Sequence, residues 1–282
     1  KYRNSSQIIN KKTAPAIKLL YGLLIGRVIL KVLTKPTISK VGAKYMESPF
    51  SKVWNRRFIK KNKIDLDEYE KKKYKSYNDL FTRKIKTEAR PIDINPERLI
   101  SPCDGKLLVY PINKDSSFSI KNSIYNVADL TGGKSFKDYN DGLALIFRLE
   151  VNDYHHYCYI DDGKKSKNIF IKGVLHTVQP IANRYNVYKQ NSREYTVLHT
   201  KNFSDIIQIE IGALMVGKIV NHHQKYKFKK GEEKGLFEFG GSTIVLLIKK
   251  DKVIIDSDIL ENSLRGIETI VKMGEKIGKK RR

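Results

Sequence analysis

From about residue 99 onward, short apolar runs alternate with turn residues along the chain. The runs include KLLVYPI, GLALIFRL, IIQIEIGALMVGKIV and STIVLLI. Runs this short and rich in β-branched residues are typical of strands, because an amphipathic helix needs a longer stretch with a period near 3.6 residues. We therefore predict a β-rich domain over residues 91–282, preceded by a helical segment over residues 1–90. The expected fold class is α+β.

Residues 14–33, APAIKLLYGLLIGRVILKVL, are the most apolar part of the N-terminal segment. Its longest uncharged run is far shorter than the roughly 20 residues that span a bilayer. The pattern predicts a helix with a broad apolar face and basic flanks. Such a helix either lies in a membrane interface or packs on its own domain, and the sequence leaves both open. Farther along, a buried patch is predicted at Trp54, Phe58 and Ile59.

The charge balance favours an anionic partner. The chain has 55 Lys and Arg against 30 Asp and Glu, which gives a net charge of +25. Such a surplus suits nucleic acid, an anionic lipid or an acidic substrate, although many single lysines are merely solvated surface. No helix-turn-helix, RNA-recognition or zinc-finger signature accompanies the charge, so we predict no nucleic-acid partner. The two cysteines, Cys103 and Cys158, are too few for a disulfide framework and fit a reducing, cytosolic setting.

The stretch GLFEFGGSTIVLLIKK places two glycines, a serine and a threonine directly before a β-branched run. Glycine weakens a strand interior and is usually kept where the backbone bends or is approached closely. For an isolated Gly240-Gly241-Ser242-Thr243, a bulge or a tight turn is the simpler interpretation. Any chemical role for Ser242 therefore has to be argued from the rest of the chain.

Two further segments carry residues suited to acid–base chemistry. SPCDGKL contains Asp104 in an Asp-Gly pair, which on its own is a turn signal. NDYHHYCYIDDG places two adjacent histidines in a strand-like run. Strand alternation puts Asp153 and His155 on one face and His156 and Cys158 on the other, so the two histidines should not enter the same pocket. The histidine pairs lack a metal-binding spacing, and we predict no metal site.

Taken together and in order, several segments resemble the phosphatidylserine decarboxylases. The segments are SYNDLFTRKIKTEARPID, SPCDGKL, NDYHHYCYIDDG, QPIANRYNVYKQNSREYTVL, IGALMVGKIV, KGEEKGLFEFGGSTIVLL and GIETIVKMGEKIG. They run from about residue 76 to the end of the sequence. Each motif alone is a weak signal, whereas seven in the same order identify the chain as similar to this family.

The resemblance implies a proenzyme that cleaves itself between Gly241 and Ser242, giving chains 1–241 and 242–282. The serine hydroxyl would attack the preceding carbonyl, and elimination would turn Ser242 into a pyruvoyl group, the covalent cofactor. The amine of phosphatidylserine would form a Schiff base with that ketone, lose carbon dioxide and be released as phosphatidylethanolamine.

The resemblance also implies a setting for this chemistry. The catalytic domain would be related to barrel-sandwich hybrid folds and often forms a homodimer. The enzyme would sit peripherally on the cytoplasmic face of the cell membrane, on an anionic phospholipid surface.

Roles transfer from the family one residue at a time. Asp104 matches the aspartate of the Asp-Gly motif, which would tune the base for self-cleavage. His155 matches the first histidine of D-Y-H-x-x-H and would donate a proton during decarboxylation. The second histidine of that motif falls at Cys158, and a thiol is a poor general base near pH 7. Three alternatives follow: His155 serves both steps, Cys158 acts as a thiolate, or His156 turns inward through a bulge. We favour the first.

Other functions also fit parts of the sequence. The same chemistry could act on another serine-headgroup lipid, or on a soluble amino acid, which would not need a basic apolar helix. A non-enzymatic biotinyl- or lipoyl-like module, or a basic binding protein, would show no cleavage at Ser242. These hypotheses are distinguished by testing for cleavage at Ser242 and by comparing activity on lipid and soluble substrates.

Overall fold

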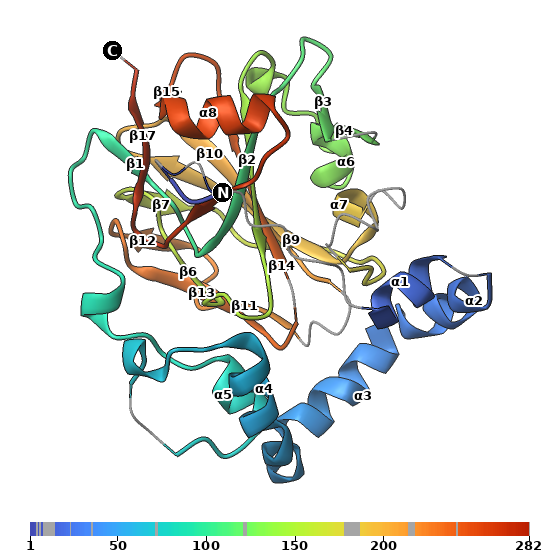
Figure 1. Ribbon diagram of the computed structural model, residues 1–282. Helices are drawn as coiled ribbons and strands as arrows, with labels where there is room; N and C mark the ends of the chain where they lie inside the picture. Colours follow the sequence, from blue (N-terminus) through green and yellow to red (C-terminus); the bar gives the residue numbers. More distant parts are fainter. Residues whose placement is uncertain are drawn as a thin grey trace.

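The structure is a computed structural model of the chain (Figure 1). It describes residues 1–3, 5, 7, 15–22, 24–34, 36–70, 73–120, 123–177, 187–213, 218–240 and 242–281. Gly241, to which the sequence assigns the cleaved carbonyl, lies outside the described residues, as does most of the QPIANRYNV stretch.

Helices precede the strands and gather at one end of the molecule (Figure 1). They are α1 (Pro15–Gly22), α2 (Leu24–Leu33), α3 (Pro36–Glu47), η1 (Pro49–Trp54), α4 (Asn55–Asn62), η2 (Leu66–Glu68), α5 (Tyr77–Phe81) and η3 (Thr87–Ala89). The helices among the strands are α6 (Val127–Leu130), η4 (Lys137–Tyr139), α7 (Val187–Gln190) and α8 (Ser257–Leu264). No helix among the described residues is long and apolar enough to cross a membrane.

The strands begin at residue 98 and pair antiparallel throughout the described sheets. They are β1 (Arg98–Ile100), β2 (Gly105–Pro111), β3 (Ser117–Ile120), β4 (Ser123–Asn126), β5 (Leu143–Leu149), β6 (His156–Cys158), β7 (Gly163–Lys165), β8 (Ile169–Ile171) and β9 (Arg193–Thr200). The later ones are β10 (Asp205–Ile211), β11 (Lys218–Asn221), β12 (Tyr226–Phe228), β13 (Glu233–Glu238), β14 (Ser242–Ile248), β15 (Val253–Ile255), β16 (Thr269–Val271) and β17 (Lys276–Lys280).

Among the described residues, the largest sheet has nine strands, and the candidate serine begins one of its central strands, β14. Its order is β12-β7-β9-β10-β14-β5-β2-β16, with β8 paired to β9. A second sheet, β11-β13-β6, carries the histidine segment, and a third has the order β1-β17-β15. None of these sheets closes into a barrel. The α+β class predicted from the sequence is confirmed, with helices first and antiparallel sheets after them.

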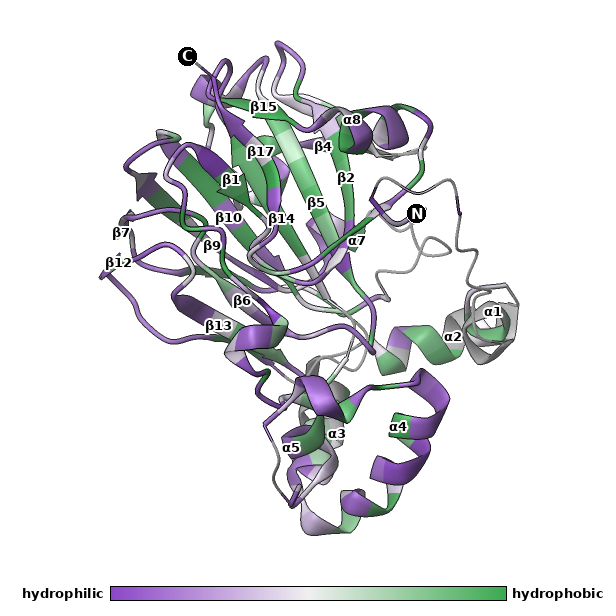
Figure 2. Ribbon diagram, turned by 60° about the vertical axis from the view of Figure 1, so that its left-hand side comes forward, coloured by the Kyte–Doolittle hydropathy of each residue, from purple (hydrophilic) through white to green (hydrophobic). Residues whose placement is uncertain are grey.

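Strand β14 is buried on both faces, which explains its unbroken apolar run. Every residue from Ser242 to Ile248 is buried. Ile244 and Leu246 contribute to one core, shared with the β6 and β13 residues Cys158 and Phe237, while Val245 and Leu247 contribute to a second core on the other face. Figure 2 shows the neighbouring β2, β5 and β14 as hydrophobic over much of their length. A strand covered on both sides does not need polar residues at alternate positions.

The helical end differs in part from the sequence prediction. Residues 14–33 hold two helices, α1 and α2, in place of one. In the predicted patch, Phe58 is buried with Leu80 and Phe81, and Ile59 packs against them. Trp54 was predicted wrongly, because 41% of its surface is exposed. It ends η1, where the chain turns into α4, and its indole nitrogen donates to the Tyr45 hydroxyl at the surface.

Candidate active site

Ser242 begins β14 at the end of a tight backbone turn. The backbone of Gly240 has φ of 124°, a value that residues other than glycine rarely adopt. Phe239 before it has φ of 21°. Ser242 then pairs with Leu149 of β5, so it lies on the same sheet face as Ile244. Its side chain is fully buried and its Oγ has no hydrogen-bond partner among the described residues. A buried hydroxyl without a partner is costly, and such groups mark sites of function or strain.

His155 lies just before β6 and is oriented by a backbone carbonyl. Its Nδ1 is 2.9 Å from the Asp153 carbonyl oxygen. Because that oxygen can only accept, Nδ1 carries the proton and Nε2 keeps a lone pair. Nε2 is buried and has no partner among the described residues. Burial is the main cause that lowers the pKa of His155, to about 3, so the imidazole is neutral near pH 7.

An aromatic wall from the helical end connects the histidine with the turn before Ser242. The Phe81 ring of α5 lies 4.4 Å from the His155 ring, centroid to centroid. The same Phe81 lies 5.9 Å from Phe239, and Tyr77 lies 5.1 Å from Phe239. Ser76 precedes helix α5, and its hydroxyl caps the helix by accepting from the Asp79 amide. The apolar face of this short helix therefore covers both parts of the site.

Asp104 is held as a carboxylate by several donors. Arg90 donates to both of its oxygens, at 2.9 Å from Nε and 2.7 Å from Nη2. The Met273 amide donates at 2.9 Å, and Lys272 Nζ lies 3.3 Å away. Burial by itself raises the pKa of Asp104, but the Arg90 hydrogen bonds and the Lys272 charge outweigh it and hold the pKa below its usual value. Asp104 is thus a fixed negative charge, and it has no hydrogen bond to Ser242 or His155 within the described part of the chain.

Cys158 remains a thiol in this environment. Its side chain is buried in the core beside Tyr157 and Tyr159. Its sulfur donates weakly to the Ser101 carbonyl oxygen at 3.9 Å. Burial raises the pKa of the thiol to about 12, so almost none of it is thiolate near pH 7. These surroundings count against the alternative in which Cys158 is the base.

His156 points to other partners. Its Nε2 lies 3.1 Å from the Thr82 carbonyl oxygen, and its Nδ1 lies 3.0 Å from Glu233 Oε2. Its ring stacks on Tyr154 at 4.7 Å. The β6–β13 pairing does contain an irregularity, but it lies in β13, between Glu233 and Gly235, and leaves β6 regular. The bulge that would turn His156 inward is therefore absent from its own strand.

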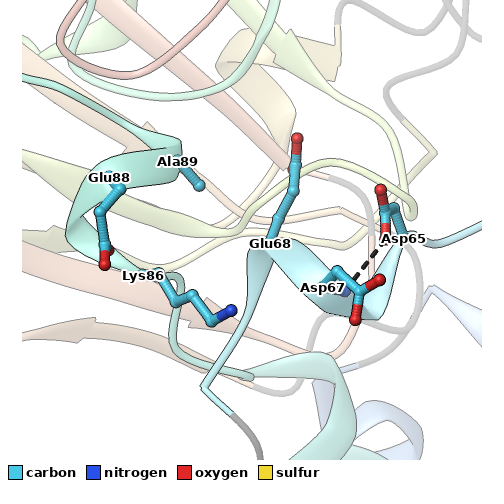
Figure 3. A pocket seen from close by; sticks show the side chains of 6 residues that line it. All are labelled: Asp65, Asp67, Glu68, Lys86, Glu88 and Ala89. Carbon is cyan, nitrogen blue, oxygen red and sulfur yellow. Dashed lines mark hydrogen bonds between the residues drawn. The ribbon is translucent and has the colours of Figure 1, made fainter.

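Two arginines beside these residues, Arg83 and Arg90, were not predicted from the sequence as part of the site. Both stand in the quoted segment SYNDLFTRKIKTEARPID, where they are arginines in a stretch whose other basic residues are lysines. Arginine is the residue that binds carboxylates and phosphates through a planar fork, so this choice was a usable signal. A hollow of about 420 Å³ lies elsewhere, lined by Asp65, Asp67, Glu68, Lys86, Glu88 and Ala89 (Figure 3). None of the candidate catalytic residues lines it.

The described residues contain no cluster of three or more His, Cys, Asp or Glu side chains that could hold a metal ion. What the site offers instead is a buried hydroxyl, a neutral imidazole with a free lone pair, and an apolar wall. Such a set suits proton transfer and nucleophilic attack in a water-poor setting.

Comparison with known proteins gives one consistent result. The profile of the phosphatidylserine decarboxylase family matches residues 77–279. The chain is 51% identical to "Phosphatidylserine decarboxylase proenzyme 2" of Clostridium acetobutylicum, over 93% of this chain and 91% of that protein. It is 42% identical to the phosphatidylserine decarboxylase proenzyme of a Clostridium botulinum strain and 40% identical to that of Fusobacterium nucleatum, each over 93% of this chain. The shares covered of those two proteins are 91% and 90%.

Proposed function

The chain belongs to the phosphatidylserine decarboxylase family, and from that membership we propose that it converts phosphatidylserine into phosphatidylethanolamine and carbon dioxide through a pyruvoyl group made from Ser242. The observation that carries the proposal is that Ser242 Oγ and His155 Nε2 are both buried and have no hydrogen-bond partner among the described residues. A site that leaves both a hydroxyl and an imidazole lone pair unsatisfied is organised for a reaction between them and a third group.

Self-cleavage uses groups of this chain alone. Ser242 Oγ attacks the carbonyl carbon of residue 241, and the peptide C–N bond breaks as the ester C–O bond forms, with the hydroxyl proton passing to the amine. A base then removes the Ser242 α-proton, and the ester leaves as the carboxylate end of chain 1–241. Tautomerisation and hydrolysis of the dehydroalanine release ammonia and leave the pyruvoyl group. Neutral His155 is our candidate for the base, since its Nε2 can accept a proton.

The residues around Ser242 suit the formation and use of a pyruvoyl group. The turn at Phe239 and Gly240 leads into Ser242 at a strand end, and the unpartnered Oγ gives the hydroxyl freedom to attack. When formed, the pyruvoyl group supplies a carbonyl that takes up the electron pair left when carbon dioxide departs. The aromatic wall of Phe81 and Phe239 excludes water, and His155 can return a proton to the substrate carbon. Asp104 contributes a fixed negative charge held by Arg90.

The test of the function combines mass spectrometry with a substrate comparison. We expect two chains, 1–241 and 242–282, with the shorter one blocked at its N-terminus, and carbon dioxide release from phosphatidylserine vesicles. A single intact chain after long incubation would overturn the pyruvoyl mechanism. Equal or faster turnover of free serine than of the lipid would favour the alternative, a decarboxylase of a soluble amino acid.

An exposed apolar patch at the helical end supports a peripheral membrane location. Phe50 is 82% exposed and Val53 is 73% exposed, both in η1, and Trp54 adjoins them. Basic side chains flank the patch, at Lys52, Arg56 and Arg57. Aromatic and aliphatic side chains ringed by basic ones suit insertion into an anionic bilayer surface. The cytoplasmic face of the cell membrane supplies such a surface.

Replacing Phe50 with aspartate is expected to weaken binding to anionic vesicles about tenfold or more, because insertion of a Phe side chain is lost and a negative charge is added. Vesicle sedimentation measures the change. The matched control is Ile94→Asp, which alters a similarly exposed residue outside the patch, 81% exposed. Equal weakening by both variants would show that the patch has no special role.

A further inference from the structure

Arg83 is a buried cation with no anionic partner among the residues that the structure describes. Its side chain is the largest fully buried one among the described residues, with 1% of its surface exposed. No carboxylate in the described part of the chain lies within ion-pair distance of its guanidinium. A buried charge is normally paired, because removing an ion from water costs several kcal/mol. The position is unusual, since nearby Arg90 is paired with Asp104.

The neutral groups around Arg83 make few good hydrogen bonds with its guanidinium. Nη2 donates to the Tyr69 hydroxyl at 3.0 Å, and the guanidinium lies 4.2 Å from the centroid of the Tyr69 ring. The three contacts with the carbonyl oxygens of Leu80, Phe81 and Asn152 are each 3.4 Å long, at the limit for a hydrogen bond. Nε has no partner at all among the described residues. Arg83 therefore retains donor capacity and an uncompensated positive charge.

Arg83 is also next to the catalytic groups. It follows Phe81, whose ring packs on both His155 and Phe239, and it contacts the Asn152 carbonyl, three residues before His155. Its charge is one of the causes that lower the pKa of His155, after burial. An anion bound at Arg83 would thus lie within the site that holds His155 and the turn before Ser242.

We infer that Arg83 is the receptor for the phosphodiester of the substrate headgroup. The inference rests on the proposed function and names the recognition element of the same site. A guanidinium fork matches two phosphate oxygens, and one phosphodiester charge neutralises one arginine. The substrate carboxylate is the less suitable ligand: it leaves as uncharged carbon dioxide, so a cation holding it would stabilise the starting state more than the transition state. The apolar wall of Phe81 and Phe239 suits that carboxylate better.

Self-cleavage offers a way for the substrate to reach this buried group. Phe239 packs on Phe81, whose carbonyl contacts Arg83. Breaking the chain after residue 241 creates a free end two residues beyond Phe239. The chain end and Phe239 can then move away together, which an intact chain restrains.

The test measures binding to the cleaved enzyme by calorimetry with two probes that share an amine. Glycerophosphoethanolamine carries a phosphodiester and no carboxylate, whereas O-methyl-L-serine carries a carboxylate and no phosphate. Arg83→Met is expected to weaken binding of glycerophosphoethanolamine about 10- to 100-fold, as for loss of charge-assisted hydrogen bonds, and to leave binding of O-methyl-L-serine unchanged. Arg83→Lys keeps the charge but not the planar fork. Its affinity for glycerophosphoethanolamine is expected to lie between those of the wild type and Arg83→Met.

The melting temperatures of the variants distinguish ligand recognition by Arg83 from a structural role of this residue. Replacing an unpaired buried charge with an apolar side chain of similar length should leave the melting temperature of the free enzyme unchanged or raise it, while ligand-dependent stabilisation is lost. Lys84→Met is the matched control, because this neighbouring cation is 64% exposed and pairs with Glu70 at the surface.

Two results would overturn the inference. One is equal binding of glycerophosphoethanolamine by the wild type and Arg83→Met. The other is a loss confined to O-methyl-L-serine, which would assign the carboxylate to Arg83. Mass spectrometry on the same samples reports cleavage at Ser242 independently, so failure of the pyruvoyl mechanism is distinguishable from failure of this assignment. If Arg83→Met does not fold, the comparison of Arg83→Lys with the wild type decides.

Discussion

Replacing Ser242 with alanine is expected to leave one intact chain of 282 residues and to lower decarboxylase activity by roughly 10⁴-fold or more, the scale seen when a nucleophile is removed. Alanine lacks the oxygen that attacks the carbonyl of residue 241, so neither the new chain end nor the pyruvoyl group can form. The fold should remain, because Ser242 Oγ makes no hydrogen bond among the described residues. Denaturing electrophoresis and intact mass measure cleavage, and carbon dioxide release measures activity.

Ser242→Cys is the matched control. A thiol at the same position can accept the acyl group and be eliminated in the same way, so two chains should still form, at a different rate. If the alanine variant still splits between residues 241 and 242, the serine is not the nucleophile. A melting temperature for Ser242→Ala far below that of the wild type would mean that loss of folding, and not loss of the nucleophile, explains its inactivity.

Replacing His155 with alanine is expected to lower the decarboxylation rate per cleaved molecule by about 10²–10⁴-fold. This is the usual contribution of a general acid or base. The neutral imidazole, held by the Asp153 carbonyl and covered by Phe81, is the group placed to move a proton. We also expect slower self-cleavage, since His155 is our candidate base for that step. Activity must be normalised to the amount of blocked chain 242–282, measured by mass spectrometry.

Cys158→Ala is the control for the departure from the family motif. Because the thiol stays protonated near pH 7, its removal should leave substantial self-cleavage and cost only ~1–2 kcal/mol of stability, as is common for a small buried change. The decisive comparison is between the two variants. A Cys158→Ala protein that remains fully uncleaved, beside a His155→Ala protein that matures normally, would reverse the assignment.

Much of the fold was predictable because its signals are local. The short β-branched runs after residue 99 became antiparallel strands, and β14 became a strand buried on both faces. The order of the motifs was enough to predict the family, which the comparisons show. The exposure of Trp54 was not predictable, because burial of one side chain depends on which neighbours cover it. The break between α1 and α2 was missed for a similar reason: a continuous apolar pattern fits one helix or two.

The candidate site was only partly predictable. The sequence names Ser242, Asp104, His155 and Cys158 through motifs, and these roles stay proposals. It did not reveal that Asp104 is held by Arg90 and Met273, since these partners lie 14 and 169 residues away. It also did not single out Arg83, because an unpaired cation can be recognised only when its surroundings are known.

By itself, the sequence determined the strand-rich class and the family, because residue type and spacing along the chain encode them, and it predicts Gly241–Ser242 as the scissile bond. Tertiary structure alone decided the chemical state of the other candidate residues. Near pH 7 His155 is neutral, with no partner for its Nε2 among the described residues, Cys158 is a thiol and Asp104 is a carboxylate. The physical reason is that a pKa depends on desolvation and on charges contributed by distant segments, and folding is what brings those segments together.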